Sequence, residues 1–177
     1  MAIIKTTLTT LITAIAVVAI YATTKPDDFR VERSQIIKAP SEKIFPLIND
    51  FNHWPQWSPW EDLDPNMKKT LKGAPKGVGA ISEWEGNKDV GSGKIEIIKS
   101  TPNTQITMQL DMQKPFPAAN TVEFSLASEK DETKVTWSMS GKNSFIAKVM
   151  SIFINCEKMV GDQFEKGLSK LKEVSEK

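Results

Sequence analysis

The fold of this chain is constrained most by a series of short segments in which apolar and polar residues alternate. Three of them alternate cleanly, at residues 105–112, 121–128 and 134–140. Alternation with a period of two places the apolar side chains of a strand on one face, so these segments predict an antiparallel sheet with one buried face. Weaker strand character is present at residues 29–38, 67–71, 79–84 and 93–100. We therefore expect a sheet of about six to seven strands.

The pattern changes after residue 143, where apolar residues recur every three or four positions. They are Val149, Ile152, Phe153, Cys156, Val160, Phe164, Leu168 and Leu171. This spacing predicts an amphipathic helix. Since no proline interrupts residues 144–174, we expect one helix of about thirty residues, roughly 45 Å long. Gly161 and Gly167 each disfavour the helix by about 1 kcal/mol, and we expect them to let it approach a neighbouring segment closely.

The order of the predicted elements indicates the fold class. Between the first strand and the others, a short helix is predicted over residues 41–48 and a second short helix or turn over residues 51–57. The chain therefore runs through one strand, one or two short helices, about six strands and one long helix. A long amphipathic helix that follows its own antiparallel sheet must pack across that sheet. We expect an α+β domain with two layers.

The first 25 residues differ from the remainder, residues 26–177. They contain no acidic residue, and residues 6–22 are uncharged and rich in Leu, Ile and Val. As a helix, residues 6–22 would span about 25 Å, at the short end for a bilayer core of about 30 Å. We expect an uncleaved N-terminal membrane anchor, with the domain on the extracytoplasmic side. A cleaved signal peptide is the alternative, because Val17-Val18-Ala19 would serve as a cleavage site and would release a secreted protein.

Residue counts exclude several kinds of site. The chain has one Cys, Cys156, and one His, His53, so a single chain cannot form an intramolecular disulfide or a zinc-binding Cys–His cluster. The formal net charge of +1 gives no electrostatic basis for nucleic-acid binding. Residues 91–94, Gly-Ser-Gly-Lys, lack the rest of a phosphate-binding loop. We therefore predict no metal, no cofactor and no nucleic-acid partner.

Large aromatic and sulfur-containing side chains indicate a candidate ligand site. Three of the five Trp residues lie between positions 54 and 60. Two interpretations are open: they form a wall or lid over an apolar cavity, or they only anchor a long loop to the sheet. The inward faces of the predicted strands and helix add Met and aromatic residues, which suit adaptable apolar pockets. The predicted ligand-binding residues are Trp54, Trp57, Trp60, Trp84, Met108, Met112, Phe124, Trp137, Met139 and Phe153.

Seven segments cover nearly the whole domain in order and carry a family resemblance. They are VERSQIIKAPSEKIFPLIND (31–50), FNHWPQWSPWEDLDPNM (51–67), GVGAISEWEGN (77–87), VGSGKIEII (90–98), KPFPAANTVEFSL (114–126), TKVTWSMSG (133–141) and GDQFEKGLSKLKE (161–173). Together they resemble the polyketide cyclase/dehydrase and lipid transport family of the START-like (SRPBCC) superfamily. The resemblance implies the helix-grip fold, in which a strongly curved antiparallel sheet grips the C-terminal helix around a cavity. It also implies binding of apolar molecules, with catalysis in only some members.

Three functions follow as hypotheses. We expect first a domain that binds, or transports, a hydrophobic small molecule or lipid in the cavity. The alternatives are a cyclase/dehydratase-type enzyme that uses the same cavity and an interaction module with no ligand. The domain is poor in acid–base groups other than carboxylates, and Glu83 and Glu85, beside Trp84, are the carboxylates that we would test. We predict no catalytic residue.

Overall fold

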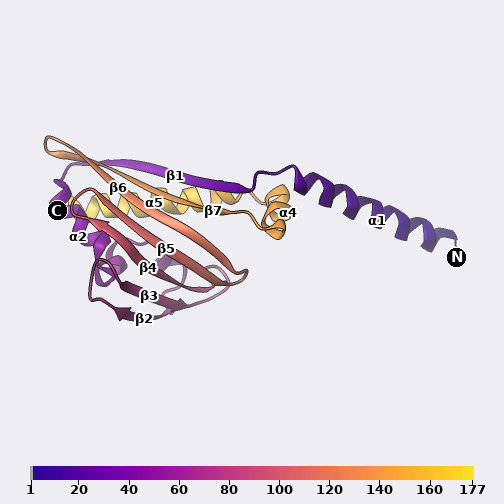
Figure 1. The fold of residues 1–177 in the computed structure, drawn as a ribbon, viewed down its shortest axis with the longest axis horizontal. Helices are drawn as coiled ribbons and strands as arrows, with labels where there is room; N and C mark the ends of the chain where they lie inside the picture. Colours follow the sequence, from indigo (N-terminus) through magenta and orange to yellow (C-terminus); the bar gives the residue numbers. More distant parts are fainter. Residues whose placement is uncertain (1) are drawn as a thin grey trace.

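The computed structural model describes the backbone of residues 2–177 and the side chains of residue 7 and residues 10–177. Its elements (Figure 1) are α1 (Ala2–Thr23), β1 (Asp28–Ile37), α2 (Ser41–Asn49), the 3₁₀ helix η1 (Phe51–Gln56), α3 (Trp60–Leu63), β2 (Lys68–Gly73), β3 (Ala80–Glu85), β4 (Ser92–Thr101), β5 (Gln105–Lys114), β6 (Ala118–Glu129), β7 (Glu132–Lys142), α4 (Phe145–Phe153) and α5 (Cys156–Ser175).

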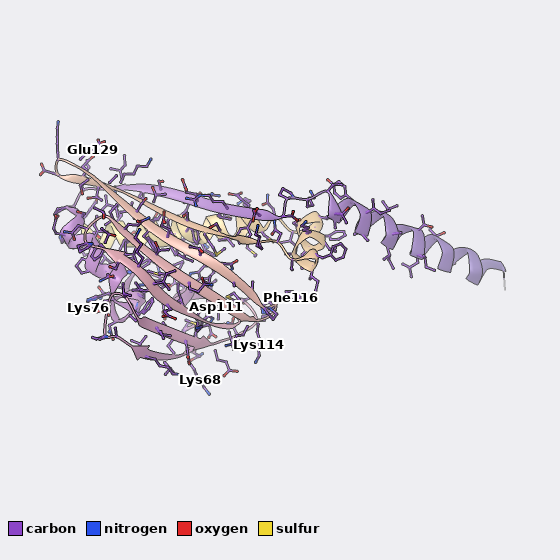
Figure 2. All side chains as sticks on the ribbon, viewed as in Figure 1. Lys68, Lys76, Asp111, Lys114, Phe116 and Glu129 are labelled. Carbon is purple, nitrogen blue, oxygen red and sulfur yellow. The ribbon has the colours of Figure 1, made fainter. Side chains whose placement is uncertain are left out.

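Within residues 2–177, seven strands form one antiparallel sheet in the order β1-β7-β6-β5-β4-β3-β2. Strands β2 to β7 are therefore neighbours in chain order, and β1 returns to pair with β7 from Asp28↔Lys142 to Ile37↔Thr133. The β4–β5 pairing shifts register at two places, and such bulges increase the local twist of a sheet. Strand β2 is an edge strand that is exposed along its whole length, and Figure 2 labels Lys68 at this edge.

The core lies between one face of the sheet and α5, which runs along the sheet in Figure 1. Inward positions of β6 and β7 alternate as predicted, and the buried ones include Val122, Phe124, Leu126, Val135 and Trp137. Helix α5 adds its own apolar stripe, with Phe164, Leu168 and Leu171 almost completely buried. Each such side chain contributes about 1.5–3 kcal/mol when it is removed from water. The predicted α+β class, with a helix packed on an antiparallel sheet, is confirmed.

The prediction of one continuous helix over residues 144–174 is wrong. Helix α4 ends at Phe153, Ile154 is extended (φ −125°, ψ 127°), and α5 begins at Cys156. The side chain of Asn155 caps α5 by accepting a hydrogen bond from the backbone N–H of Lys158 at 2.9 Å. Asn is among the preferred N-cap residues because its side chain satisfies an otherwise unpaired backbone N–H. The three- to four-residue spacing of apolar residues therefore continues through both segments, although they form two separate helices.

Asn155→Ala is expected to destabilise the domain by about 0.5–2 kcal/mol, because α5 loses its side-chain cap. Chemical denaturation followed by circular dichroism would measure the loss. Asn155→Asp is the matched control, since a carboxylate oxygen can accept the same hydrogen bond, and it should stay close to the original stability. Equal losses in both variants would contradict a capping role.

The two glycines of α5 allow close approach, as predicted. A Cβ atom at Gly167 would lie 2.7 Å from Cζ3 of Trp137 and 2.9 Å from Cδ of Pro59. At Gly161 the guanidinium of Arg33 occupies the space that a Cβ would need. Arg33 also forms ion pairs with Glu157 at 2.9 Å and Glu165 at 2.7 Å, and these carboxylates raise its pKa, Glu157 most strongly. These ion pairs therefore link strand β1 to α5 outside the core.

Helix α1 extends away from the domain in Figure 1 and meets α4 near its C-terminal end. Several of its large apolar side chains are exposed, including Leu11, Ile15 and Ile20. Among the described residues, no helix combines the length and the apolar character needed to cross a membrane. This finding does not support the predicted membrane-spanning anchor at residues 6–22. The boundary between residues 25 and 26 and the extracytoplasmic location stay predictions.

Candidate functional site

A cavity of about 290 Å³ lies between the sheet and α5, and we call it the inner cavity. Most of its wall is apolar: strands contribute Ile95, Leu110 and Val122, and α5 contributes Val160 and Phe164. Its volume is close to the lower limit of typical ligand pockets, which is about 300 Å³. The space between the layers is therefore only partly filled by side chains.

A second hollow of about 640 Å³ lies over β1, β6 and β7 near Asp28 and Lys142. It is shallow and open to solvent, and most of the residues along it are polar or charged. Enclosure and an apolar wall favour ligand binding. The inner cavity is therefore the better candidate site, although the hollow is larger.

The structure brings together six of the ten residues that the sequence predicts as ligand-binding. Those that line the inner cavity are Trp54, Trp60, Trp84, Met112, Trp137 and Met139. Three others, Trp57, Met108 and Phe124, are completely buried in the core beside the cavity and do not line it. Phe153 lies on α4 with 71% of its surface exposed, because the break at residues 154 and 155 separates α4 from the sheet. Whether any of the ten contacts a ligand stays a prediction.

The tryptophan-rich segment combines both roles that the sequence leaves open. The indole N–H of Trp57 donates to the backbone carbonyl of Leu47 at 2.9 Å, and that of Trp54 donates to the carbonyl of Ile48 at 3.0 Å. These bonds anchor η1 to the end of α2. Trp54 also presents part of its ring to the inner cavity, as does Trp60 at the start of α3. In this segment Trp57 is an anchor, Trp60 is part of the cavity wall, and Trp54 is both.

An aromatic stack borders the inner cavity. The ring of Trp137 stacks on Phe164 with centroids 4.1 Å apart and an angle of 11°, and on Phe124 at 4.8 Å and 29°. Trp57 meets Trp137 edge-on at 5.7 Å. Aromatic pairs of this kind contribute about 0.5–1.5 kcal/mol beyond the burial of their area. This side of the cavity is consequently formed by closely packed aromatic rings.

Charged residues occur at the rim of the inner cavity. The ammonium of Lys69 donates to both carboxylate oxygens of Glu61, at 2.6 and 2.7 Å, and Asp89 is exposed nearby. The two carboxylates proposed for testing lie elsewhere, since Glu83 pairs with Lys72 at 2.7 Å and Glu85 lies 3.6 Å from Lys114. Neither Glu83 nor Glu85 lines the cavity. The geometry therefore provides no proton-transfer role for them there.

The sequence prediction omitted several cavity residues, which include Ser58, Met67, Ser82, Val90, Asn120, Val160 and Phe164. A signal existed for some of them. Val160 and Phe164 belong to the predicted apolar stripe of the helix. Asn120 is two residues from Val122 and therefore lies on the same, inward face of the strand. Met67 and Val90 lie in loops, whose path the alternation pattern does not describe.

An antiparallel sheet packed on a C-terminal helix around an apolar cavity defines a helix-grip domain. Residues 28–176 match the model of the family described as polyketide cyclase / dehydrase and lipid transport. The chain belongs to this family, which confirms the resemblance seen in its segments. No curated protein matches the chain in sequence.

Three solved structures with the same fold have low sequence identity to this chain. Protein CV1439 from Chromobacterium violaceum is 14% identical, with 86% of this chain and 99% of that chain covered and a TM-score of 0.60. The Aha1 dimer from Colwellia psychrerythraea is 18% identical, with coverage of 84% and 96% and a TM-score of 0.60. Protein MLL2253 from Mesorhizobium loti is 20% identical, with coverage of 83% and 95% and a TM-score of 0.57. These similarities establish the fold.

Proposed function

We propose that this protein binds a hydrophobic small molecule or lipid in the inner cavity. The observation that carries the proposal is the cavity itself: about 290 Å³ of space between the sheet and α5 with a mainly apolar wall. Membership of a family described by lipid transport as well as by polyketide cyclase / dehydrase activity supports a hydrophobic ligand. Transfer of the ligand between membranes or proteins would be a further step of the same function.

The driving force for binding would be removal of apolar ligand surface from water. Burial contributes about 25 cal/mol per Å², and part of this gain offsets the translational and side-chain entropy lost on association. Two features of the wall would reduce that loss. The stacked rings of Trp137 and Phe164 are already ordered, while Met112 and Met139 can adjust to the outline of a ligand.

A variant that fills the inner cavity should abolish binding. Val160→Trp places a large ring in the cavity wall, so the affinity for the neutral dye Nile red, followed by its fluorescence, is expected to fall at least tenfold. Val78→Trp is the matched control, because Val78 is 57% exposed and lies outside the cavity. Unchanged dye affinity in a folded Val160→Trp protein would contradict binding in this cavity.

Native mass spectrometry of the protein isolated from its own cells would test for a natural ligand. A bound mass that is released on denaturation and is absent from Val160→Trp is the expected result. If Val160→Trp does not fold, Met139→Trp places the ring on β7 instead and serves the same purpose.

A further inference from the structure

Buried polar groups without partners lie in the wall of the inner cavity. Among the described residues, the buried side-chain atoms with no hydrogen-bond partner are Ser92 Oγ, Asn120 Oδ1, Trp137 Nε1 and Ser175 Oγ. Two of these residues, Asn120 and Trp137, line the cavity, and they are only 7% and 2% exposed. A buried donor or acceptor that stays unpaired destabilises a folded protein, so such groups in a cavity wall call for an explanation.

Trp137 differs from three other tryptophans around the cavity, Trp54, Trp57 and Trp84. The indole N–H groups of Trp54, Trp57 and Trp84 all donate to backbone carbonyls, at 3.0, 2.9 and 3.1 Å. The indole N–H of Trp137 has no such acceptor, although the ring stacks on both Phe124 and Phe164. It is therefore a buried donor that no group of the described residues uses.

The packing of the Trp137 ring limits where this N–H can point. Its faces contact Phe164 and Phe124, and its six-membered edge, at Cζ3, faces Gly167 of α5. The five-membered edge, which carries Nε1, is on the opposite side of the indole. Trp137 lines the cavity, and Trp57 packs against this ring edge-on.

Asn120 is the second buried polar residue of the cavity wall with an unpaired atom, and it lies at a different place along the strands from Trp137. It pairs with Gly141 in the β6–β7 register, while Trp137 pairs with Phe124. The two positions are separated by four residues along β7, or about 13 Å. The side-chain oxygen Oδ1 of Asn120 has no hydrogen-bond partner, and Asn120 also borders the second hollow, which is open to solvent. Ser58 and Ser82 are buried residues of the same cavity wall.

The charged residues that line the cavity favour an uncharged ligand. Lys69 is the cation among the described lining residues, and its ammonium already neutralises Glu61. An anionic headgroup near Trp137 would consequently be buried without a counter-charge, which is strongly unfavourable. A neutral acceptor oxygen, in contrast, would satisfy the indole N–H at no such cost.

We propose that the ligand is an uncharged amphiphile whose hydroxyl or carbonyl oxygen is placed inside the cavity to accept a hydrogen bond from Trp137 Nε1, while Asn120, farther along the sheet, would contact a second polar group of a longer ligand. This inference rests on the proposed function, because it specifies the chemistry of the molecule that occupies the inner cavity. The polar group enters the domain, and the hydrocarbon part fills the remaining apolar space.

The test compares probes of equal chain length: n-decanol, n-decane and decanoate, each displacing Nile red from the 177-residue protein. The measured quantity is the ratio of the decane dissociation constant to the decanol dissociation constant. In Trp137→Phe, which keeps an aromatic ring but has no donor, this ratio is expected to fall at least fivefold. In Trp57→Phe, whose lost hydrogen bond is structural, the ratio should stay unchanged. Decanoate should bind more weakly than decanol to the original protein.

The outcomes separate the two proposals. If no probe displaces the dye from the original protein, the proposed function is wrong, and this inference is wrong with it. If decanol and decane both bind and their ratio is the same in Trp137→Phe, only the inference is overturned. Tighter binding of decanoate than of decanol would also overturn it.

One further measurement keeps the test decisive if Trp137→Phe does not fold. In the ¹⁵N-labelled protein, decanol should shift the indole N–H resonance of Trp137 downfield and leave that of Trp57 in place. An unmoved Trp137 resonance in the decanol-saturated protein would overturn the inference.

Discussion

Phe164→Ala is expected to lower the free energy of unfolding by about 3–5 kcal/mol, the usual range for removing a buried aromatic ring. Phe164 is 2% exposed, stacks on Trp137 at 4.1 Å and belongs to the face of α5 that covers the sheet. The variant loses this stack and joins the vacated volume to the inner cavity. Urea denaturation followed by tryptophan fluorescence and circular dichroism would measure the change.

Phe153→Ala is the matched control, since it removes the same side chain from the same C-terminal region. Phe153 is 71% exposed on α4, so its loss should change stability by no more than about 0.5 kcal/mol. Similar effects in the two variants would contradict the break between α4 and α5, because both positions would then lie on one buried helical stripe.

Trp57→Ala is expected to cost about 3–5 kcal/mol as well. Trp57 is completely buried, and its indole N–H donates to the Leu47 carbonyl. Its ring also meets Phe124 and Trp137 edge-on at 5.9 and 5.7 Å. The variant would therefore leave a void and an unpaired carbonyl in the core, and one of the two indole hydrogen bonds to the end of α2 would be lost. Thermal and urea denaturation are the measurements.

Trp60→Ala provides the comparison within the same segment. Trp60 is only partly buried and lines the inner cavity, so its removal should change stability little and lower the affinity for Nile red. If Trp57→Ala kept full stability and lost dye binding, Trp57 would be a wall residue, and the separation of anchor and wall within this segment would be wrong.

Most of the fold could be predicted because it follows from periodicity. Period-two alternation identified β5, β6 and β7, and three- to four-residue spacing identified the apolar face of α5. The interruption at Asn155 was not predicted, because the apolar spacing continues through it. The signal for the break was a single capping residue inside an apolar stripe, and capping is a matter of local backbone geometry that hydrophobic spacing does not report.

The sequence predicted which face of the sheet the site residues occupy, but it did not predict which of them reach the cavity. Parity correctly assigned Met108, Met112, Phe124 and Trp137 to the inward face, yet Met108 and Phe124 lie in the closed part of the core while Met112 and Trp137 reach the cavity. Where along a strand the two layers separate depends on sheet curvature and on the loops that cover the ends. Neither can be read from alternation alone.

The break between α4 and α5 also divides the C-terminal region into parts of unequal local stability. The α-helical hydrogen-bonding pattern is interrupted at Ile154 and Asn155, α4 has no buried residue, and α5 buries six. Local opening of α4 therefore requires little loss of packing, whereas opening of α5 requires the core to come apart. Amide protons of α4 should consequently exchange with solvent by frequent local fluctuation, while those between Phe164 and Leu171 exchange only when the whole domain unfolds.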